Sequence, residues 1–377
     1  MTPEHAPDRP RFGVEEEFWV VDATTRHTVP RAGAVIRRAG PLLGDRVGGE
    51  ITEMQVETRT RPCHTLDDLH DQLREARTLL AAAAAEEGLR IAGGGTPVLG
   101  PMIPSPITQG PRQDLGNATF RGLHHELGMN AVHVHVEVPE RERALMVSNH
   151  LRPYLPTLIA LTATSPYWDE RDTGYASWRT LLWQRWPVAG PPPYFTSEAH
   201  YEELIASFEA AGAIVDVGTV FWDIRPSSRL PTLEVRVADM PITAEESALL
   251  AALVRALVVT VLPLVDAGDR GPVVSPETMR LAYWRAARDG LGGDGIDPRT
   301  GRPAPSATLA RRLLETVRPA LGGDAGRVAA WLDGLVEDGD GATRQRRARE
   351  RQGGLAGVVD HVVAHTAPAV PQESTSQ

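Results

Sequence analysis

Residues 132–138, within a predicted strand over residues 130–138, alternate strictly between valine and polar side chains. Valine occupies every second position, and His133, His135 and Glu137 lie between the valines. Because side chains of a β-strand point alternately to its two faces, this segment predicts a strand with one aliphatic face and one face of three ligand-type groups. A chain that contains such a strand must cover the valines with a core and must solvate or neutralise the opposite face.

Three further predicted strands, at residues 11–22, 50–60 and 230–238, also carry acidic groups. Alternation gives each strand one polar face, and these faces bear Glu15 and Glu17, Glu53 and Glu57, and Glu234 and Arg236, respectively. Like charges gathered on one sheet cost free energy unless cations neutralise them. Oxygen ligands with an occasional imidazole suit Mg²⁺ or Mn²⁺, so the set predicts a divalent-metal site. For any single glutamate, a solvated strand face is the alternative.

All 39 residues counted as lysine or arginine are arginines. The absence of lysine excludes Schiff-base chemistry on a lysine amine and the lysine-dependent phosphate loop. Bound phosphate would have to be held by guanidinium groups, backbone amides and divalent metal. Arginines recur at positions where an anion would need neutralising, namely Arg171, Arg179, Arg225 and Arg236. For each of them a surface ion pair is the alternative.

Strand patterns are concentrated before residue 240, and helical patterns follow it. Without a regular alternation of strand and helix, an α+β fold with an antiparallel or mixed sheet is favoured over a doubly wound parallel sheet. With 377 residues and 42% hydrophobic content, the chain can bury the core of one elaborated domain. We expect a flexible N-terminus over residues 1–10, one catalytic domain over residues 11–365 and a disordered tail over residues 366–377.

A formal net charge of −10 argues against binding to nucleic acid or anionic membranes and favours small charged substrates. The most apolar stretch, residues 247–262, is interrupted by Arg255 and is shorter than the roughly 20 residues that span a bilayer. The single cysteine, Cys63, indicates a reducing compartment, and we give it no chemical role. We expect a cytoplasmic protein and leave a homodimer open. His124 and His125 show no ligand spacing and are expected at the surface.

Four motifs, at residues 13–18, 53–58, 132–136 and 233–236, resemble in this order those of the glutamate–cysteine ligase superfamily, in its bacterial carboxylate–amine ligase (type 2) branch. The resemblance covers roughly residues 11–265 and is weaker beyond them. It implies a glutamine-synthetase-like fold, in which helices flank a curved, mostly antiparallel sheet that forms a funnel. ATP would bind at one end of the funnel and the amino-acid substrates at the other.

The resemblance also implies an activity and the residues that perform it. The activity is ATP-dependent ligation of a carboxylate, with glutamate as the expected acyl donor, to an amine through an acyl phosphate. The implied ligands of Mg²⁺ or Mn²⁺ are Glu15, Glu17, Glu53, His133 and Glu234. The implied catalytic residues are Arg236 and Arg179, the implied nucleotide-binding residues are Arg225 and Arg236, and the residues expected to line the site are Glu57, His135 and Arg171. The aromatic-rich loop at residues 165–193 is expected to shape the amine pocket.

Two other classes of protein stay open at this point. A phosphotransferase related by fold to guanidino kinases would transfer phosphate without making an amide. A non-catalytic binding protein on the same scaffold would be expected to have lost metal ligands, and this sequence keeps them.

Overall fold

Seven strands form one sheet at the centre of the molecule. In the computed structural model, which describes residues 9–367, their order is β10-β11-β5-β1-β3-β2, and β4 pairs with β1 off this path. Each of these pairings is antiparallel, which confirms the α+β class with an antiparallel sheet. The strands are β1 (Phe12–Asp22), β2 (Val47–Gly49), β3 (Gln55–Arg59), β4 (Leu89–Ala92), β5 (Ala131–Glu137), β10 (Ile224–Pro226) and β11 (Thr232–Asp239).

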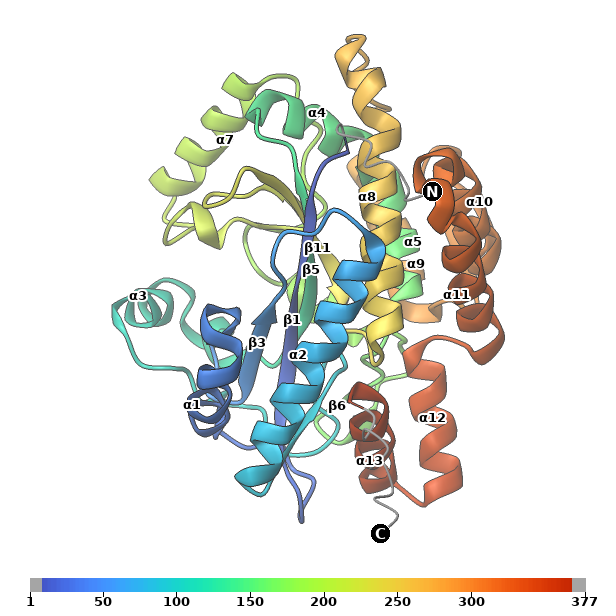
Figure 1. The fold of residues 1–377 in the computed structure, drawn as a ribbon. Helices are drawn as coiled ribbons and strands as arrows, with labels where there is room; N and C mark the ends of the chain where they lie inside the picture. The colour runs from blue at the N-terminus through green and yellow to red at the C-terminus, as the bar shows by residue number, and fades with distance from the viewer. Residues whose placement is uncertain (1–8, 368–377) are drawn as a thin grey trace.

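One face of the sheet is aliphatic and packs on helices. The valines of β5 lie in the main hydrophobic cluster together with side chains of α2 (Leu66–Glu86) and α8 (Ala244–Asp266). Figure 1 shows these two helices side by side against the sheet. Both begin at a threonine cap, because Thr65 accepts from the amide of Asp68 and Thr243 forms a reciprocal capping box with Glu246.

Helix α8 is long and apolar enough, by length and composition alone, to cross a membrane. In this structure it packs against α2, α4 (Arg141–Leu151), α10 (Ser306–Leu321) and the strands β1 and β5. Its hydrophobic residues are therefore explained by their place in the core, because an apolar helix with neighbours on most sides is what a central core position requires.

The chain after residue 240 is almost entirely helical, as predicted. Besides α8 and α10, this part contains α9 (Pro276–Asp289), α11 (Ala325–Asp338), α12 (Gly341–Gln352), α13 (Leu355–Thr366) and the short hairpin of β12 (Asp294–Asp297) and β13 (Arg302–Pro305). Thr366 ends α13 with a buried side chain that accepts from the amide of Gly93, so the predicted tail begins too early at residue 366. Residues 1–8 and 368–377, which make up most of the two predicted flexible ends, lie outside the described residues.

The other face of the sheet is polar and is surrounded by shorter elements. Figure 1 shows α3 on the opposite side of the sheet from α8. The elements of this half are α3 (Pro111–Phe120), η2 (Arg121–Glu126), α6 (Trp178–Trp183), α7 (Glu198–Ala210), the hairpin β6 (Tyr167–Trp168) and β7 (Arg171–Asp172), and the parallel pair β8 (Ala189–Gly190) and β9 (Phe221–Trp222). Between these elements and the polar face of the sheet lies a cavity. In contrast, α1 (Ala32–Leu43) packs on α2, and α5 (Leu155–Leu161) packs on α9 and α10, so both contribute to the main hydrophobic cluster.

Candidate active site

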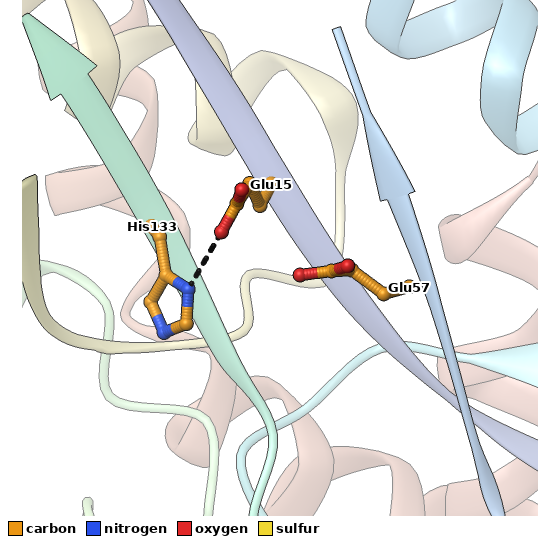
Figure 2. Close-up of side chains that lie close together, drawn as sticks. All are labelled: Glu15, Glu57 and His133. Atoms are coloured by element: carbon orange, nitrogen blue, oxygen red, sulfur yellow. Dashed lines mark hydrogen bonds and ion pairs between the residues drawn. The ribbon is translucent and has the colours of Figure 1, made fainter. Parts of the chain in front are cut away.

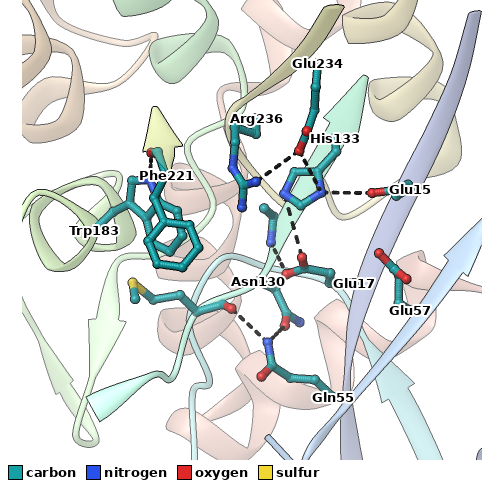
Figure 3. Close-up of polar contacts among 12 residues, drawn as sticks. Glu15, Glu17, Gln55, Glu57, Asn130, His133, Trp183, Phe221, Glu234 and Arg236 are labelled. Atoms are coloured by element: carbon teal, nitrogen blue, oxygen red, sulfur yellow. Dashed lines mark hydrogen bonds and ion pairs between the residues drawn. The ribbon is translucent and has the colours of Figure 1, made fainter. Parts of the chain in front are cut away.

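A cavity of about 530 Å³ opens on the polar face of the sheet. The strand register explains its floor, because Glu15 stands opposite His133, Glu17 opposite Glu57, and Glu234 opposite His135. Residues that face one another in register share a face of the sheet. The sequence-predicted polar faces of β1, β3, β5 and β11 therefore meet in one place (Figure 3).

The centre of this floor can hold a divalent cation. Glu15, Glu57 and His133 each offer a ligand atom, and these atoms lie within 4.8 Å of one another (Figure 2). The Nδ1 atom of His133 lies 3.2 Å from Glu15 and 4.0 Å from Glu234, and its Nε2 atom lies 3.8 Å from Glu17. His133 Nε2 and His135 Nε2 are buried and have no hydrogen-bond partner among the described residues. Buried ring nitrogens without partners beside several carboxylates are suited to binding a divalent cation.

The pKa values of these glutamates are shifted by burial and by neighbouring charges. Burial and the nearby Glu50 raise the pKa of Glu17 to about 8, and the same two causes raise the pKa of Glu57 well above its usual range. Burial also raises the pKa of Glu15, but contacts with His133 and His135 outweigh it and hold that pKa below its usual range. A divalent ion would remove the penalty that keeps Glu17 and Glu57 protonated.

Two arginines stand beside the acidic cluster. Arg225 forks the carboxylate of Glu234 with contacts of 2.9 and 3.3 Å, and Arg236 donates to the same carboxylate at 3.0 Å. The guanidinium of Arg236 also lies over the rings of Trp183 and Phe221, at 5.4 and 5.7 Å from their centroids. Both arginines line the same cavity as the acidic cluster, and guanidinium groups at such a wall can bind an anion.

Three residues that the sequence predicted for the site do not line the cavity. Glu53 is in the turn before β3 and does not line the cavity, whereas Glu50, three residues earlier, does. Arg171 is exposed on the hairpin of β6 and β7, where it pairs with Asp169 at 3.4 Å, so its predicted place in the lining is corrected. Arg179 is buried behind Arg236 rather than facing the cavity, and it donates to backbone carbonyls.

One end of the cavity is aromatic. Trp186 makes edge-on contacts with Phe120 and with Phe221, at centroid distances of 4.7 and 5.4 Å. His124 completes this wall, and its Nδ1 atom lies 2.6 Å from the side-chain oxygen of Asn117. His124 was expected at the surface but is buried, and sequence spacing gave no signal for its position because α3 and η2 bring it there. Of the aromatic side chains in the loop 165–193, Trp186 lines the cavity and the other five do not.

A second cavity, which we call the annex, adjoins the opposite end. Its volume is about 270 Å³. It shares Glu15, Arg59, His135 and Leu230 with the main cavity. Its remaining lining comes from residues 11–14, 60, 62, 137, 231 and 232, and its surface is mostly apolar although Arg11 and Glu137 belong to it. The acidic cluster therefore lies between an apolar annex and an aromatic end.

Two solved structures share this arrangement of elements. The fold is similar to that of a glutamate–cysteine ligase from Francisella tularensis solved in complex with AMP, with a TM-score of 0.70 at 11% sequence identity over 95% of this chain and 88% of the other. It is also similar to a bifunctional glutathione synthetase from Pasteurella multocida, with a TM-score of 0.67 at 14% identity over 95% of this chain and 52% of that one. These likenesses confirm the predicted glutamine-synthetase-like fold class.

The sequence gives the family. Residues 11–365 match glutamate-cysteine ligase family 2, and the chain belongs to that family. A protein of Nocardia farcinica, named provisionally as glutamate–cysteine ligase 2-1, is 45% identical over 95% of this chain and 94% of its own length. A protein of Saccharopolyspora erythraea with the same provisional name is 44% identical over 97% of this chain and 98% of its own length. The resemblance seen in the four motifs is thus confirmed over nearly the whole chain, and it supports a ligase that forms amide bonds.

Proposed function

We propose that this protein is an ATP- and magnesium-dependent carboxylate–amine ligase that makes a γ-glutamyl amide through an acyl phosphate. The observation that carries the proposal is the meeting of the acidic cluster and Arg236 in one cavity. A carboxylate is a poor acyl donor, so ATP must first convert it to an acyl phosphate, which the amine then attacks with release of phosphate. The site needs to hold a highly charged nucleotide beside a carboxylate, which are two anions that repel each other.

The residues that would hold Mg²⁺ are Glu15, Glu57 and His133. Glu17 and Glu234 lie 3.8 and 4.0 Å from His133, and Glu50 lines the same cavity. Bound metal would neutralise phosphate oxygens and align the in-line transfer. Arg236 would approach the transferred phosphate from the side of Glu234, where its planar fork is fixed by that carboxylate and by the rings of Trp183 and Phe221. Arg225 would add a second positive charge to the same wall.

The two ends of the cavity suggest how the substrates lie. The apolar annex suits a nucleoside, because a base and ribose need an apolar slot and the annex opens directly onto Glu15 and His135. The phosphates would then cross the acidic cluster toward Arg236. The acid and the amine would occupy the aromatic end, where Trp186 and Phe221 can pack against the amine's side chain.

A screen of ATP hydrolysis against amino acids and amines, with mass detection of the condensed product, tests the proposal. The expected result is glutamate-dependent release of ADP and phosphate together with an amide. Hydroxylamine serves as a small acceptor that places no demand on the amine pocket, so a glutamyl hydroxamate would report acyl-phosphate formation by itself. Phosphate transfer to a guanidino compound with no amide product would instead support the phosphotransferase class, and nucleotide binding with no turnover would support a binding protein.

We also propose a cytoplasmic location and small-molecule partners. The support is a fold shared with ligases of small substrates and a single cysteine that is buried and unpaired, which suits a reducing compartment. The homodimer stays a prediction.

A further inference from the structure

We propose that Arg179 is a positioning residue, which directs Arg236 into the cavity by holding a bulge in β11. Arg179 itself does not touch the cavity. The kinetic part of the test rests on the proposed ligase function, and the structural part does not.

The bulge is visible in the register between β11 and β5. Val235 stands opposite Val134 and Ala238 opposite Val132, so three steps along β11 match two steps along β5. The extra residue places both Arg236 and Val237 opposite His133.

This irregularity changes which side chains face the cavity. Val237 and Ala238 are adjacent, yet both lie in the main hydrophobic cluster on the helical side of the sheet. Arg236, one residue earlier, lines the cavity with Glu234. A regular strand would continue to alternate and would turn residue 238 toward the cavity in place of the core. The bulge ends the polar face of β11 at Arg236.

A bulge disrupts the hydrogen-bond ladder, and Arg179 occupies the carbonyls at this point. Its Nη1 atom donates to the carbonyl of Val237 at 3.1 Å, and its Nη2 atom donates to the carbonyl of Arg236 at 3.2 Å. One planar guanidinium therefore spans the peptide groups that follow Arg236 and Val237. The amide of Arg236 is held from the other side, since it donates to the carbonyl of Asp223 at 2.8 Å.

Arg179 is itself fixed by a buried polar network. Its backbone amide donates to the hydroxyl of Ser165 at 3.0 Å, and that hydroxyl donates to Asp239 at 2.6 Å. Asp239 also accepts from Ser177 at 2.8 Å and lies 4.0 Å from the guanidinium of Arg179. Because Arg179 is held in one position, its two hydrogen bonds can fix the backbone of β11 at Arg236.

Both guanidinium groups also pack on one ring. The carbon centres of Arg179 and Arg236 lie 5.5 and 5.4 Å from the centroid of Trp183. Arg179 and Arg236 are therefore connected in two ways. Their side chains both contact the ring of Trp183, and the guanidinium of Arg179 also binds the backbone of β11 next to Arg236. Loss of Arg179 is expected to let Arg236 turn away from Glu234 without removing any group from the cavity.

The test is a double-mutant cycle between Arg179→Gln and Arg236→Lys. Arg179→Gln alone should lower kcat about 10- to 100-fold with the KM for ATP changed less than about threefold, since the group that meets the transferred phosphate is displaced. In the Arg236→Lys background, the same change should cost less than about threefold, because the correctly placed guanidinium is already gone. Equal costs in both backgrounds, or normal kcat in a folded Arg179→Gln variant, would overturn the proposal.

Arg77→Gln is the matched control. Arg77 is as buried as Arg179, with 2% of its side chain exposed, and it donates to the carbonyls of Ile242 and Thr366 away from the cavity. Its loss should lower stability, and any effect on kcat should be the same in both backgrounds. If Arg179→Gln fails to fold, Arg179→Lys, which keeps the charge and loses the fork, takes its place in the cycle.

A crystal structure of the Arg179 variant gives a readout that needs no activity. The contact of 3.0 Å between Arg236 and Glu234 should be lost while the register of β5 with β1 is unchanged. An Arg236 still bound to Glu234 would overturn the inference even if the protein is not a ligase. If the native protein shows no ligation but the variant loses this contact, the proposed function fails and the inference stands.

Discussion

Glu17 and Glu57 stand opposite each other in the register of β1 and β3, and both carboxyl groups line the main cavity. Both side chains are buried, and burial together with the charge of the nearby Glu50 holds their pKa values above the usual range. The fold therefore gathers several glutamates in one cavity, and without a bound cation Glu17 and Glu57 release their protons only at a raised pH. This state has consequences for stability that can be measured.

The first prediction concerns the pH dependence of the metal-free protein. In the unfolded chain Glu17 loses its proton near 4.5, whereas in the folded protein it keeps that proton up to about 8. Between these two values the folded state binds more protons, so the contribution of Glu17 to stability falls as the pH rises. Thermal unfolding of the metal-free protein should show a larger decline in Tm from pH 5 to pH 8 than the Glu17→Gln variant does. Added MgCl₂ should restore stability in the native protein, and identical pH profiles for the two proteins would contradict the prediction.

The second prediction separates two nearby glutamates. Glu50 lines the cavity and its pKa is raised by burial and by Glu15, whereas Glu53 lies in the turn before β3 and outside the lining. Glu50→Gln should weaken Mg²⁺ binding about tenfold or more, because it removes a ligand-type charge from the cluster. Glu53→Gln should leave binding within about twofold. Isothermal titration of Mg²⁺ into both variants is the measurement. Weaker Mg²⁺ binding by Glu53→Gln than by Glu50→Gln would support Glu53 as the ligand, as the sequence predicted.

The third prediction is that Cys63→Ser keeps nearly full activity. The Cys63 thiol is buried, donates to the carbonyl of Arg61 at 3.1 Å and accepts from the side chain of Gln72 at 3.2 Å. Burial raises its pKa to about 12, so little thiolate exists at neutral pH. A hydroxyl can keep both contacts, and we expect kcat within about threefold of the native value and a loss of about 1 kcal/mol in the free energy of unfolding. A folded variant that loses about a thousandfold in kcat would show that the thiol takes part in the chemistry.

The fourth prediction concerns the amine. Trp186 lines the aromatic end of the cavity and packs against Phe120 and Phe221. Trp186→Ala should raise the KM for an amino-acid acceptor about tenfold or more, since a large apolar contact is removed, while hydroxylamine turnover changes less than about threefold. Trp178→Ala is the control, because Trp178 belongs to the same segment, residues 165–193, where it begins α6, but it does not line the cavity. Equal losses with both acceptors would assign this end of the cavity to another substrate.

Strand periodicity predicted most of the floor of the site. The alternation in β5 identified His133 and His135 because the polar face of a strand is set by sequence parity alone. Strand alternation gave a wrong prediction where the backbone does not form a regular strand. The predicted strand at residues 50–60 begins only at Gln55, because residues 53–54 form a turn. Glu53 therefore does not line the cavity, whereas Glu50 does.

The remaining site residues depend on tertiary structure that no local pattern encodes. Arg179 lies outside the cavity lining and donates to two carbonyls at the register shift of β11, and His124 is a buried residue of η2 that lines the cavity. Arg171 has the residue type that a phosphate site needs, but its hairpin carries it to the surface. Residue type and spacing predicted the chemistry, whereas placement of these three side chains required the packing of segments distant in sequence.

The last prediction is that Arg236→Lys impairs turnover far more than nucleotide binding. Arg236 donates to Glu234 at 3.0 Å and lies over two aromatic rings, so its guanidinium is held in one orientation at the wall of the cavity. A lysine keeps the charge but loses the planar fork that can contact two phosphate oxygens at once. If the fork meets charge that develops only during phosphate transfer, kcat should fall about ten- to a thousandfold with the KM for ATP nearly unchanged.

Arg112→Lys is the matched control for Arg236→Lys in steady-state kinetics. Arg112 also lines the cavity but is exposed and pairs with Asp216 at 3.1 Å, so an ammonium can replace it with a change in kcat of less than about threefold. Two results would tell against the assigned role of Arg236. A raised KM with normal kcat would mean that its charge only holds the nucleotide, because a group that binds ground state and transition state equally does not change the chemical step. Normal values of both constants would remove Arg236 from the reacting site altogether.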